Sequence, residues 1–263
     1  MKQKSSGEKP LIKGLQYHIR CGKGDVAPYV LLPGDPFRVP KIAKNWTERK
    51  KIAFHREYQT YTGKIDGGPI SCTSSGIGAP SLTIALEELV AIGSHTFIRV
   101  GTTGSIQPQI KIGDIIITTG AVRLEGASKD YIIPEYPAVA HFEVVTALIQ
   151  AAKNLKVKYH VGITATTDSF YCGQGRPGFN HYLPSFKEKI LKDLQKARVL
   201  NFEMEAACLL TLASLFGVRA GAVCVVIADR VRNKFQISDA LEELPGKVAS
   251  EAVRILGKNE LGK

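Results

Sequence analysis

Two hydrophobic patterns alternate along the chain. Continuous runs rich in Val, Ile and Phe are typical of buried strands, and apolar residues spaced three and four apart are typical of amphipathic helices. The strands predicted in this way are 29–32, 70–74, 96–100, 115–119, 159–166 and 222–227. The alternating segment 59–65 is also predicted to be a strand, joined to 70–74 in a β-hairpin by the glycine-rich residues 66–68. The predicted helices are 38–44, 82–92, 141–155, 201–216 and 240–256. This alternation predicts an α/β domain with a central mixed, largely parallel β-sheet flanked by helices.

The two ends of the domain follow from local composition. Residues 1–14 are polar and are expected to be flexible, whereas residues 15–263 are expected to form one domain. The first ten residues have no apolar stretch of the kind that a signal peptide needs, and no run reaches the roughly 20 apolar residues of a membrane span. These features predict a cytoplasmic protein without a membrane partner.

Charge and cysteine content exclude further classes. The net charge is +11, but the lysines are scattered and are not interleaved with aromatic residues, so a basic surface that attracts anionic substrates is favoured over a nucleic-acid platform. The five cysteines are an odd number without C-x-x-C spacing, which argues against a disulfide framework and a zinc site. Whether Cys172 is a reactive thiol is left undecided, because it lies in a polar loop.

The strongest candidate for chemistry is Arg99, inside the run Thr-Phe-Ile-Arg-Val that precedes Gly-Thr-Thr-Gly. The two glycines are expected to end the strand in a turn where backbone amides can approach a ligand. A guanidinium is rarely buried without a partner, so Arg99 suggests a phosphate site at this strand end. The alternative is an arginine paired with an internal carboxylate.

Further polar clusters follow the other predicted strands, as expected where an open α/β sheet binds ligands. Pro33-Gly34-Asp35-Pro36 precedes a helix that carries Arg38, so Gly34 could offer an amide to an anion. The loop 168–176 combines aromatic, amide and guanidinium groups that could bind a planar ring. Glu203 and Glu205 stand too close to share a face of the predicted helix 201–216, so one could contact a ligand while the other braces the structure or stabilises the helix N-terminus.

Five motifs occur together in order: Pro-Gly-Asp-Pro-Phe-Arg, His-Arg-Glu-Tyr, Gly-Ile-Gly-Ala-Pro-Ser, Phe-Ile-Arg-Val-Gly-Thr-Thr-Gly and Asn-Phe-Glu-Met-Glu. With their spacing from about Tyr17 to Arg230, the chain resembles the hexameric nucleoside phosphorylases. Phe-Tyr-Cys-Gly-Gln-Gly-Arg resembles the uridine branch of that family. The resemblance implies a three-layer α/β/α fold and a pentosyltransferase that reversibly converts uridine and phosphate to uracil and ribose 1-phosphate in nucleoside salvage.

The resemblance also implies roles for individual residues. The phosphate-binding positions would be Gly34, Arg38, Arg56, Arg99 and Thr102. The ribose-binding positions would be His18, Glu203, Met204 and Glu205. The base-binding positions would be Phe170, Gln174, Arg176, Ala228 and Asp229. The catalytic residues among them would be Arg99, Gln174, Arg176 and Glu205, because negative charge that develops on the leaving pyrimidine needs nearby donors.

Assembly and cofactors are implied by the same resemblance. Arg56 and His18 would serve the site of a neighbouring subunit, which implies a homo-oligomer, a hexamer built from dimers. Inorganic phosphate would be a co-substrate, with no cofactor required. Some relatives hold potassium at the dimer interface, and Glu57, Ile77 and Ser81 match those positions, so a structural potassium ion is left open.

One departure affects substrate choice. The uridine branch usually has Asn-Arg after the last core strand, whereas this chain has Asp229-Arg230. An aspartate there resembles the purine enzymes, in which it protonates the leaving base. A purine or broad-specificity phosphorylase is therefore the alternative, and a basic nucleic-acid-binding or nucleoside-sensing protein that kept the fold without catalysis is a third.

Overall fold

The secondary structure follows the predicted alternation of strands and helices. The computed structural model describes residues 5–261. Its strands are β1 (Leu11–Ile12), β2 (Leu15–Gln16), β3 (Tyr29–Pro33), β4 (Glu48–His55), β5 (Tyr58–Ile65), β6 (Gly68–Thr73), β7 (Thr96–Ser105), β8 (Ile115–Leu124), β9 (Ala138–Val139), β10 (Tyr159–Thr167), β11 (Asn201–Glu203), β12 (Arg219–Asp229) and β13 (Lys234–Phe235). Its α-helices are α1 (Arg38–Ala43), α2 (Ala79–Ala91), α3 (Phe142–Asn154), α4 (Ile190–Lys196), α5 (Ala206–Phe216) and α6 (Asp239–Leu261).

One mixed sheet of 11 strands organises the domain, in the order β13-β12-β8-β10-β11-β7-β3-β6-β5-β4 with β9 beside β8. Strand β12 pairs with β7 as well as with β8, so β7, β11, β10, β8 and β12 close into a ring. Strands β3, β7 and β12 are parallel neighbours, and Arg99 of β7 lies between Leu32 and Ala222 in their register. The carboxyl ends of these three strands therefore meet at one place, and α/β proteins commonly bind their ligands at the carboxyl ends of parallel strands.

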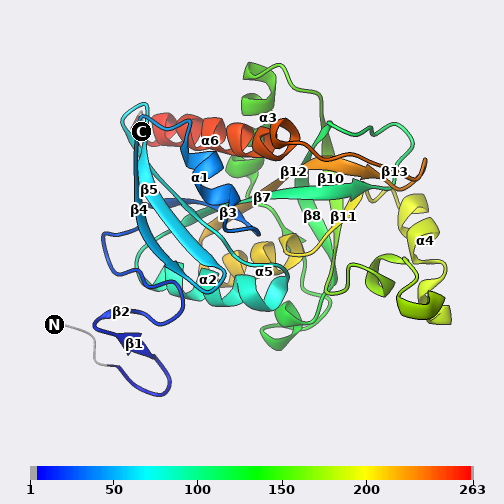
Figure 1. Ribbon diagram of the computed structural model, residues 1–263, viewed down its shortest axis with the longest axis horizontal. Coiled ribbons are helices and arrows are strands. Elements are labelled where there is room, and N and C mark those ends of the chain that lie inside the picture. Colours follow the sequence, from blue (N-terminus) through cyan, green and yellow to red (C-terminus); the bar gives the residue numbers. More distant parts are fainter. Residues whose placement is uncertain (1–4, 262–263) are drawn as a thin grey trace.

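Helices cover both faces of the sheet, as the predicted fold class requires. Alternate residues of β3 enter two separate cores: Leu31 packs with α1, α3 and α6, whereas Val30 and Leu32 pack with α2 and α5. This alternation follows from the two-residue period of a strand, and it explains why β3 is apolar on both faces. Figure 1 shows α3 and α6 on one side of the sheet and α2 and α5 on the other.

The end of β7 differs from the prediction. Gly101–Gly104 was expected to form a turn, but β7 continues as a strand to Ser105. The reason is pairing on both sides: β12 hydrogen-bonds along β7 as far as Ser105, and β11 pairs with Gly104 and Ser105. The glycines of this segment favour a turn by themselves, but pairing with two neighbouring strands keeps the segment extended.

The segment 201–205 also differs from the prediction, because its first three residues form β11 and the helix begins only at Ala206. Parallel pairing with β10 and antiparallel pairing with β7 bind these residues into the sheet. Strand β4 was not predicted, because Glu48–His55 is largely polar and none of its eight residues is buried. The predicted hairpin is confirmed as β5 and β6.

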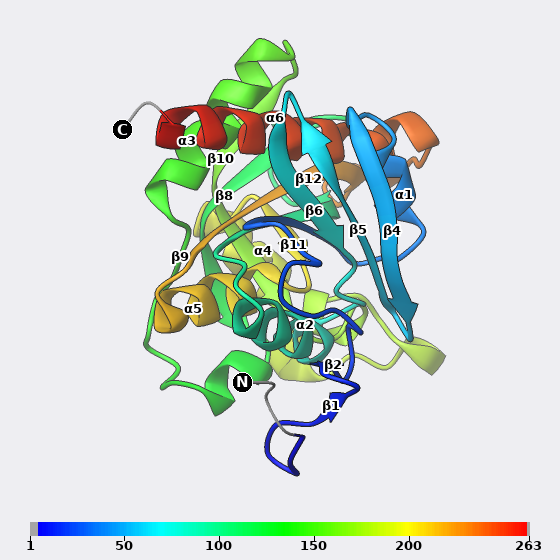
Figure 2. The same ribbon diagram turned by 90° about the vertical axis from the view of Figure 1, so that its left-hand side faces the viewer.

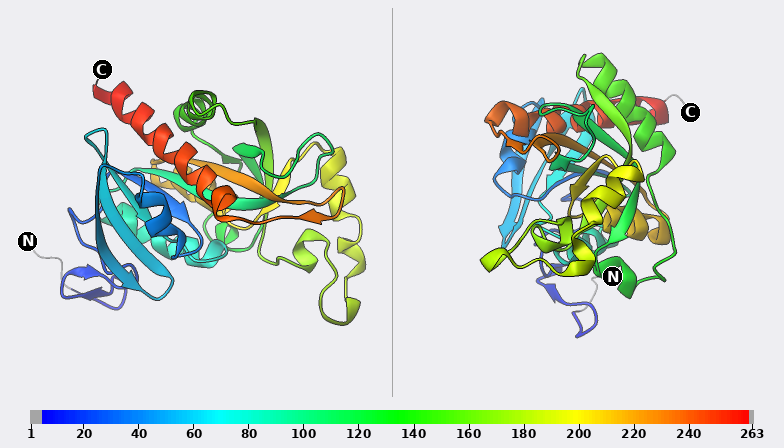
Figure 3. Two further views of the ribbon diagram at one scale, coloured as in Figure 1. Left: turned by 45° about the horizontal axis from the view of Figure 1, so that its top comes forward. Right: turned by 90° about the vertical axis from the view of Figure 1, so that its right-hand side faces the viewer.

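The β4–β5–β6 sheet end and the α4 region lie at opposite ends of the domain (Figure 3). Strands β1 and β2 form a small separate antiparallel pair near the N-terminus, which projects beside α2 (Figure 2). The prediction of a flexible segment 1–14 remains a prediction: residues 1–4 fall outside the described range, and residues 11–12 belong to β1. Within residues 5–261, no helix is both long and apolar enough to traverse a bilayer.

Candidate active site

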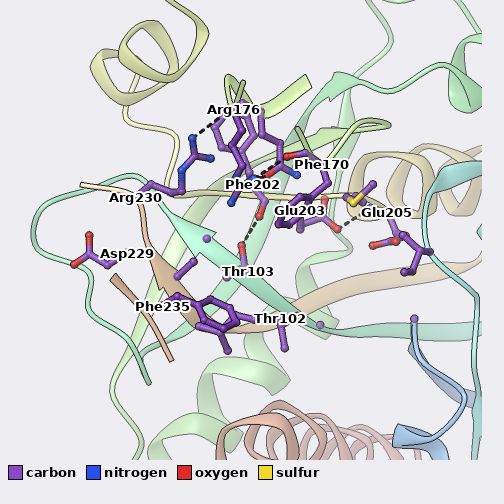
Figure 4. Close-up of a pocket in the computed structure, with 18 of the residues that line it drawn as sticks. Thr102, Thr103, Phe170, Arg176, Phe202, Glu203, Glu205, Asp229, Arg230 and Phe235 are labelled. Carbon is purple, nitrogen blue, oxygen red and sulfur yellow. Dashed lines mark hydrogen bonds between the residues drawn. The ribbon is translucent and has the colours of Figure 1, made fainter. Parts of the chain in front are cut away.

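A cavity of about 640 Å³ opens at the carboxyl ends of β3, β7 and β12. Most of its wall comes from three parts of the chain: these strand ends, the loop 168–176 and the segment 202–205 (Figure 4). The sequence-predicted residues that line it are Gly34, Arg38, Ile77, Arg99, Thr102, Phe170, Gln174, Arg176, Glu203, Met204, Glu205, Ala228 and Asp229. Folding thus brings together most of the candidate residues from positions far apart in the sequence.

Arg99 has internal carboxylate partners, which was the alternative to an unpaired guanidinium. Its Nε donates to Glu203 Oε2 at 2.6 Å, and its Nη2 forms an ion pair with Glu205. Arg99 is 5% exposed, and burial alone would lower its pKa, but the Glu205 and Glu203 charges outweigh burial and raise it. Arg99 is thus paired with internal carboxylates, as the alternative predicted, and it also lines the cavity, so its role in phosphate binding stays a prediction.

Glu203 and Glu205 both reach the same guanidinium, contrary to the prediction that they would point apart. That prediction assumed a helix over 201–216, whereas Glu203 ends β11 and Glu205 is the residue that precedes the first turn of α5, so neither lies inside the helix. Glu203 also accepts hydrogen bonds from the amides of Glu205 and Ala206, both at 2.8 Å, and from the Thr166 hydroxyl. It therefore braces the start of α5, as the macrodipole alternative predicted.

Glu205 has fewer supports than Glu203. The Gly78 amide donates to its Oε1 at 2.5 Å, and its Oε2 faces Arg99. Burial and the adjacent Glu203 charge raise the pKa of Glu205 even though Arg99 opposes the shift. Glu205 thus lies buried at the cavity wall with little to hold it besides Arg99 and one amide.

Arg38 is the second buried cation at this end of the cavity. Its Nη2 donates to the Glu242 carbonyl oxygen at 3.0 Å, whereas its Nε is buried without a hydrogen-bond partner among residues 5–261. Burial lowers the pKa of Arg38. A buried donor without a partner is costly, so this group is suited to an incoming anion. Gly34 and Thr102 line the same part of the cavity.

The other end of the cavity is built from the loop 168–176. The Arg176 guanidinium stacks over the Phe170 ring, with Cζ 4.1 Å from the ring centroid, and its Nη1 donates to the Phe170 carbonyl at 2.9 Å. The same Nη1 donates to Gln174 Oε1. Burial and the nearby Arg230 lower the pKa of Arg176 to about 10. Aromatic, amide and guanidinium groups therefore stand together as predicted (Figure 4).

Asp229 lines the cavity wall, but its carboxylate is engaged elsewhere. Oδ1 accepts hydrogen bonds from the amides of Val231 and Arg232, both at 3.0 Å, and Oδ2 pairs with Arg232 Nη1 at 2.7 Å. Burial acts to raise the pKa of Asp229, but these hydrogen bonds outweigh it and hold the pKa below its ordinary value. Figure 4 shows the carboxylate directed away from Phe170 and Arg176.

His18 and Arg56 are not among the residues that line this cavity. The His18 ring nitrogen Nδ1 lies 2.7 Å from Glu88 Oε1, and Glu88 also accepts from the amides of His18 and Ile19. Arg56 is exposed in the turn between β4 and β5, with a positive φ of 54°. Their placement on the neighbour's site stays a prediction.

The candidate potassium residues are only partly brought together. The Ser81 hydroxyl donates to Glu57 Oε1 at 3.0 Å, whereas the Ile77 side chain is 76% exposed on the loop before α2. Carboxylate, hydroxyl and carbonyl oxygens suit a hard monovalent cation. Among the described residues no group of three or more His, Cys, Asp or Glu side chains is arranged to hold a metal ion. A potassium site stays a prediction.

Several cavity residues escaped the sequence analysis. Arg230 donates from Nη2 to the Gln174 carbonyl at 3.2 Å, and its buried Nη1 has no partner within residues 5–261. Phe202 and Phe235 also line the wall. Arg230 could have been found from its place directly after the last core strand, whereas β13, which carries Phe235, is a two-residue strand that gives no periodic signal.

Comparison with known proteins agrees with this geometry. The sequence model of the Phosphorylase superfamily matches residues 28–256. The uridine phosphorylase of Thermococcus kodakarensis is 63% identical over 254 residues, covering 96% of this chain and 91% of that protein. The uridine phosphorylase of Escherichia coli is 42% identical over 249 residues, covering 91% and 97%, respectively. The guanosine phosphorylase of Halorubrum lacusprofundi is 36% identical over 241 residues, covering 92% and 95%. By sequence, fold and the position of its cavity, this chain belongs to the phosphorylase superfamily.

Proposed function

We propose that this protein is a uridine phosphorylase, which converts uridine and inorganic phosphate to uracil and ribose 1-phosphate and catalyses the reverse reaction. The observation that carries the proposal is one cavity with buried guanidiniums at one end and the Phe170, Gln174 and Arg176 cluster at the other. The relatives named uridine phosphorylase cover most of the chain and support the same conclusion.

Phosphate is proposed to bind beside Arg38 and Arg99, with Gly34 and Thr102 lining its site. Guanidinium contacts to phosphate are short and directional, so they hold one oxygen in line with the ribose C1′ atom. Glu205 and Met204 lie next to this site and are proposed to contact the ribose, with Glu203 bracing them through Arg99 and the start of α5. A carboxylate accepts hydrogen bonds from ribose hydroxyls, which suits Glu205.

The base is proposed to stack against Phe170, with Gln174 and Arg176 at its polar edge and Ala228 beside it. As the phosphate oxygen forms its bond to C1′, the glycosidic C–N bond breaks and its electron pair passes into the pyrimidine ring. The negative charge then spreads to the carbonyl oxygens, where the fixed charge of Arg176 stabilises it. Gln174 and Arg176 need no proton transfer for this role.

Asp229 is not proposed as an acid in this reaction. A group that protonates a leaving purine must hold a proton near neutral pH and face the base. The Asp229 carboxylate instead accepts three hydrogen bonds in its own turn, and its pKa is lowered. This observation supports uridine over a purine nucleoside as the substrate.

The complete site is proposed to need a second subunit. Arg56 would add a third guanidinium to phosphate and His18 would contact the ribose 5′-hydroxyl, so we propose a homo-oligomer, a hexamer built from dimers. A potassium ion held by Glu57, Ser81 and the Ile77 carbonyl at the dimer interface belongs to the same proposal. Analytical ultracentrifugation with and without potassium tests both parts.

The deciding experiment measures phosphate-dependent release of base from uridine, inosine and guanosine in parallel by ultraviolet absorbance. Turnover of uridine with little turnover of either purine nucleoside is expected. Preferential turnover of inosine or guanosine would replace the proposal with a purine or broad-specificity phosphorylase. Arg99→Ala should raise the phosphate KM, and an unchanged phosphate KM would contradict the assignment of the phosphate site.

A further inference from the structure

The hairpin between β12 and β13 is closed by a charged side-chain cluster. Asp229 is the last residue of β12 and pairs with Lys234 of β13, so residues 230–233 form the connection. Asp229 Oδ1 caps two amides of this connection, and Oδ2 forms its ion pair with Arg232, three residues further on. Asp229 is 4% exposed, so its charge is compensated almost entirely by these contacts.

Arg232 extends the cluster to a second segment of the chain. While its Nη1 pairs with Asp229, its Nη2 donates to the Pro108 carbonyl oxygen at 2.7 Å, in the connection between β7 and β8. A planar guanidinium can bridge two acceptors in this way, whereas an ammonium group cannot reproduce that geometry. Arg232 thus ties the β12–β13 connection to the end of β7.

Arg230 lies between Asp229 and Arg232 in sequence, but its side chain points toward the cavity and not toward their ion pair. Its amide donates to the Ser105 carbonyl at 2.9 Å, which fixes its backbone on β7. Its side chain reaches into the cavity wall, where Nη2 donates to the Gln174 carbonyl at 3.2 Å. Figure 4 shows the Arg230 side chain directed toward Arg176 and the Asp229 carboxylate directed away from both.

These contacts connect Asp229 to the loop 168–176, which is called the base loop here because it carries Phe170, Gln174 and Arg176. Asp229 accepts hydrogen bonds from the amides of residues 231 and 232, which fixes the backbone on either side of the Arg230 side chain. Arg230 in turn donates to the Gln174 carbonyl, and Gln174 Oε1 accepts from Arg176. Burial lowers the pKa of Arg230, because its guanidinium is held in the wall.

We propose that Asp229 and Arg232 form a clamp that positions Arg230 and, through it, Gln174 and Arg176 of the base loop. Asp229 is a positioning residue in this proposal: it neither contacts the base nor moves a proton. The proposal rests on the proposed function where it concerns the base. It explains an aspartate at a position where the uridine branch usually has asparagine, since only a carboxylate pairs ionically with Arg232.

The alternative assigns Asp229 directly to the ligand, as the proton donor of a purine enzyme. The two assignments differ in what Arg232 should do. If Asp229 acts on the ligand, removing Arg232 frees the carboxylate and should preserve or improve turnover. If Asp229 acts through the clamp, removing either partner should have the same effect, and removing both should add little.

The test compares Asp229→Asn, Arg232→Gln and the double variant with Arg254→Gln. Arg254 pairs with Glu251, also three residues away, on α6, so it is a matched control for loss of such a pair. We expect the KM for uridine to rise by about tenfold in each single variant. A displacement of about 1 Å in a substrate-positioning group can cost about 100-fold, so a tenfold change corresponds to a smaller displacement. The phosphate KM should not change, and the double variant should resemble the single ones. Arg232→Lys should recover only part of the loss.

A second measurement does not depend on activity. Hydrogen–deuterium exchange of residues 168–178 should become faster in Asp229→Asn and Arg232→Gln, and should stay at the native rate in Arg254→Gln. If the native protein failed to turn over uridine, the proposed function would fall while this exchange result would still decide the clamp. Because Arg232 is 41% exposed, its variant is expected to fold even if Asp229→Asn does not.

Three outcomes overturn the proposal. One is a loss of turnover in Asp229→Asn with native kinetics and native exchange in Arg232→Gln, which would assign Asp229 to the ligand. Another is unchanged exchange of residues 168–178 in both single variants. Loss of inosine turnover alone in Asp229→Asn, with uridine spared, would also overturn it and favour the proton-donor assignment.

Discussion

Gly101 offers a sharp test of the phosphate end of the cavity. It lies on β7 two residues after Arg99, and a Cβ at this position would stand 2.7 Å from Cys224 Sγ, 3.0 Å from Arg99 Nη2 and 3.2 Å from Arg99 Cζ. Both neighbours are fully or nearly buried, so neither can swing into solvent. The Gly101→Ala variant must therefore displace the Cys224 side chain, the Arg99 guanidinium or β7 itself.

The magnitude follows from packing. Overpacking a dense core by one methyl group costs about 1–3 kcal/mol, against a gain of roughly 0.5–1 kcal/mol when alanine replaces glycine in a strand. We expect a net loss of about 1–2 kcal/mol of unfolding free energy, which corresponds to roughly 2–8 °C in Tm for a domain of this size. Displacing Arg99 from a charge-assisted contact costs about 1.5–3 kcal/mol more in phosphate binding, or a phosphate KM raised roughly 10- to 100-fold.

Gly104→Ala is the matched control, because Gly104 lies on the same strand. A Cβ there would meet Arg230, Ala228 and Arg176 side-chain atoms at 3.5–3.6 Å, which is ordinary van der Waals contact. Thermal unfolding at one protein concentration and phosphate KM values for both variants decide the matter. If Gly101→Ala were as stable as Gly104→Ala and kept the native phosphate KM, the packing argument would be refuted. Adding Cys224→Ala should restore part of the stability but not the phosphate KM.

Three further predictions test other parts of the molecule. Glu88→Ala should reduce the preference for uridine over 5′-deoxyuridine, because Glu88 holds the His18 ring and backbone; equal loss for both nucleosides in steady-state assays would argue against it. A thiol reagent at pH 8 should modify Cys172 first, as mass spectrometry of digested protein can show, because Cys172 is only partly buried while the other four thiols are buried with raised pKa values. Arg99→Met should destabilise the protein by about 3–5 kcal/mol in denaturant titrations, because it leaves two buried carboxylates without their cation, and Glu205→Gln in the same chain should recover part of that loss.

The sequence predicts the fold well where a strand or helix has its own periodic signal. β3 and β8 begin with apolar runs, the helices α2, α3 and α6 carry a periodic apolar face, and all appear near their predicted positions, as does β10. β4 and β11 have no such signal, since β4 is mostly polar and β11 has three residues. They are strands because neighbouring strands supply their hydrogen bonds. The glycine-rich end of β7 became a strand for the same reason, as tertiary pairing outweighs local preference.

The candidate site was predictable as a set of residues but not as a set of contacts. The order of motifs brought most cavity residues to notice, and the structure gathers them at one place. The partners of Arg99 were missed, because the assumed helix at 201–205 turned Glu205 away from it. The capping of Asp229 was also missed. It depends on a three-residue turn and on Arg232, and nothing in the residue pattern distinguishes a capping aspartate from a catalytic one.

Charge counting links the phosphate site to assembly. Within one chain, Arg99 pairs with the carboxylates of Glu203 and Glu205, and Arg38 lines the same cavity, so two positive and two negative groups offset one another. A phosphate dianion would then enter a buried region without net positive charge, which is unfavourable where water cannot screen the charges. Two features change that balance: burial raises the pKa of Glu205, which favours its neutral form, and the proposed neighbour would contribute Arg56. The same protonation frees Arg99 from one of its two carboxylates. Phosphate binding should therefore weaken as the pH rises through the raised pKa of Glu205, and it should weaken further in an Arg56→Ala variant of the intact oligomer.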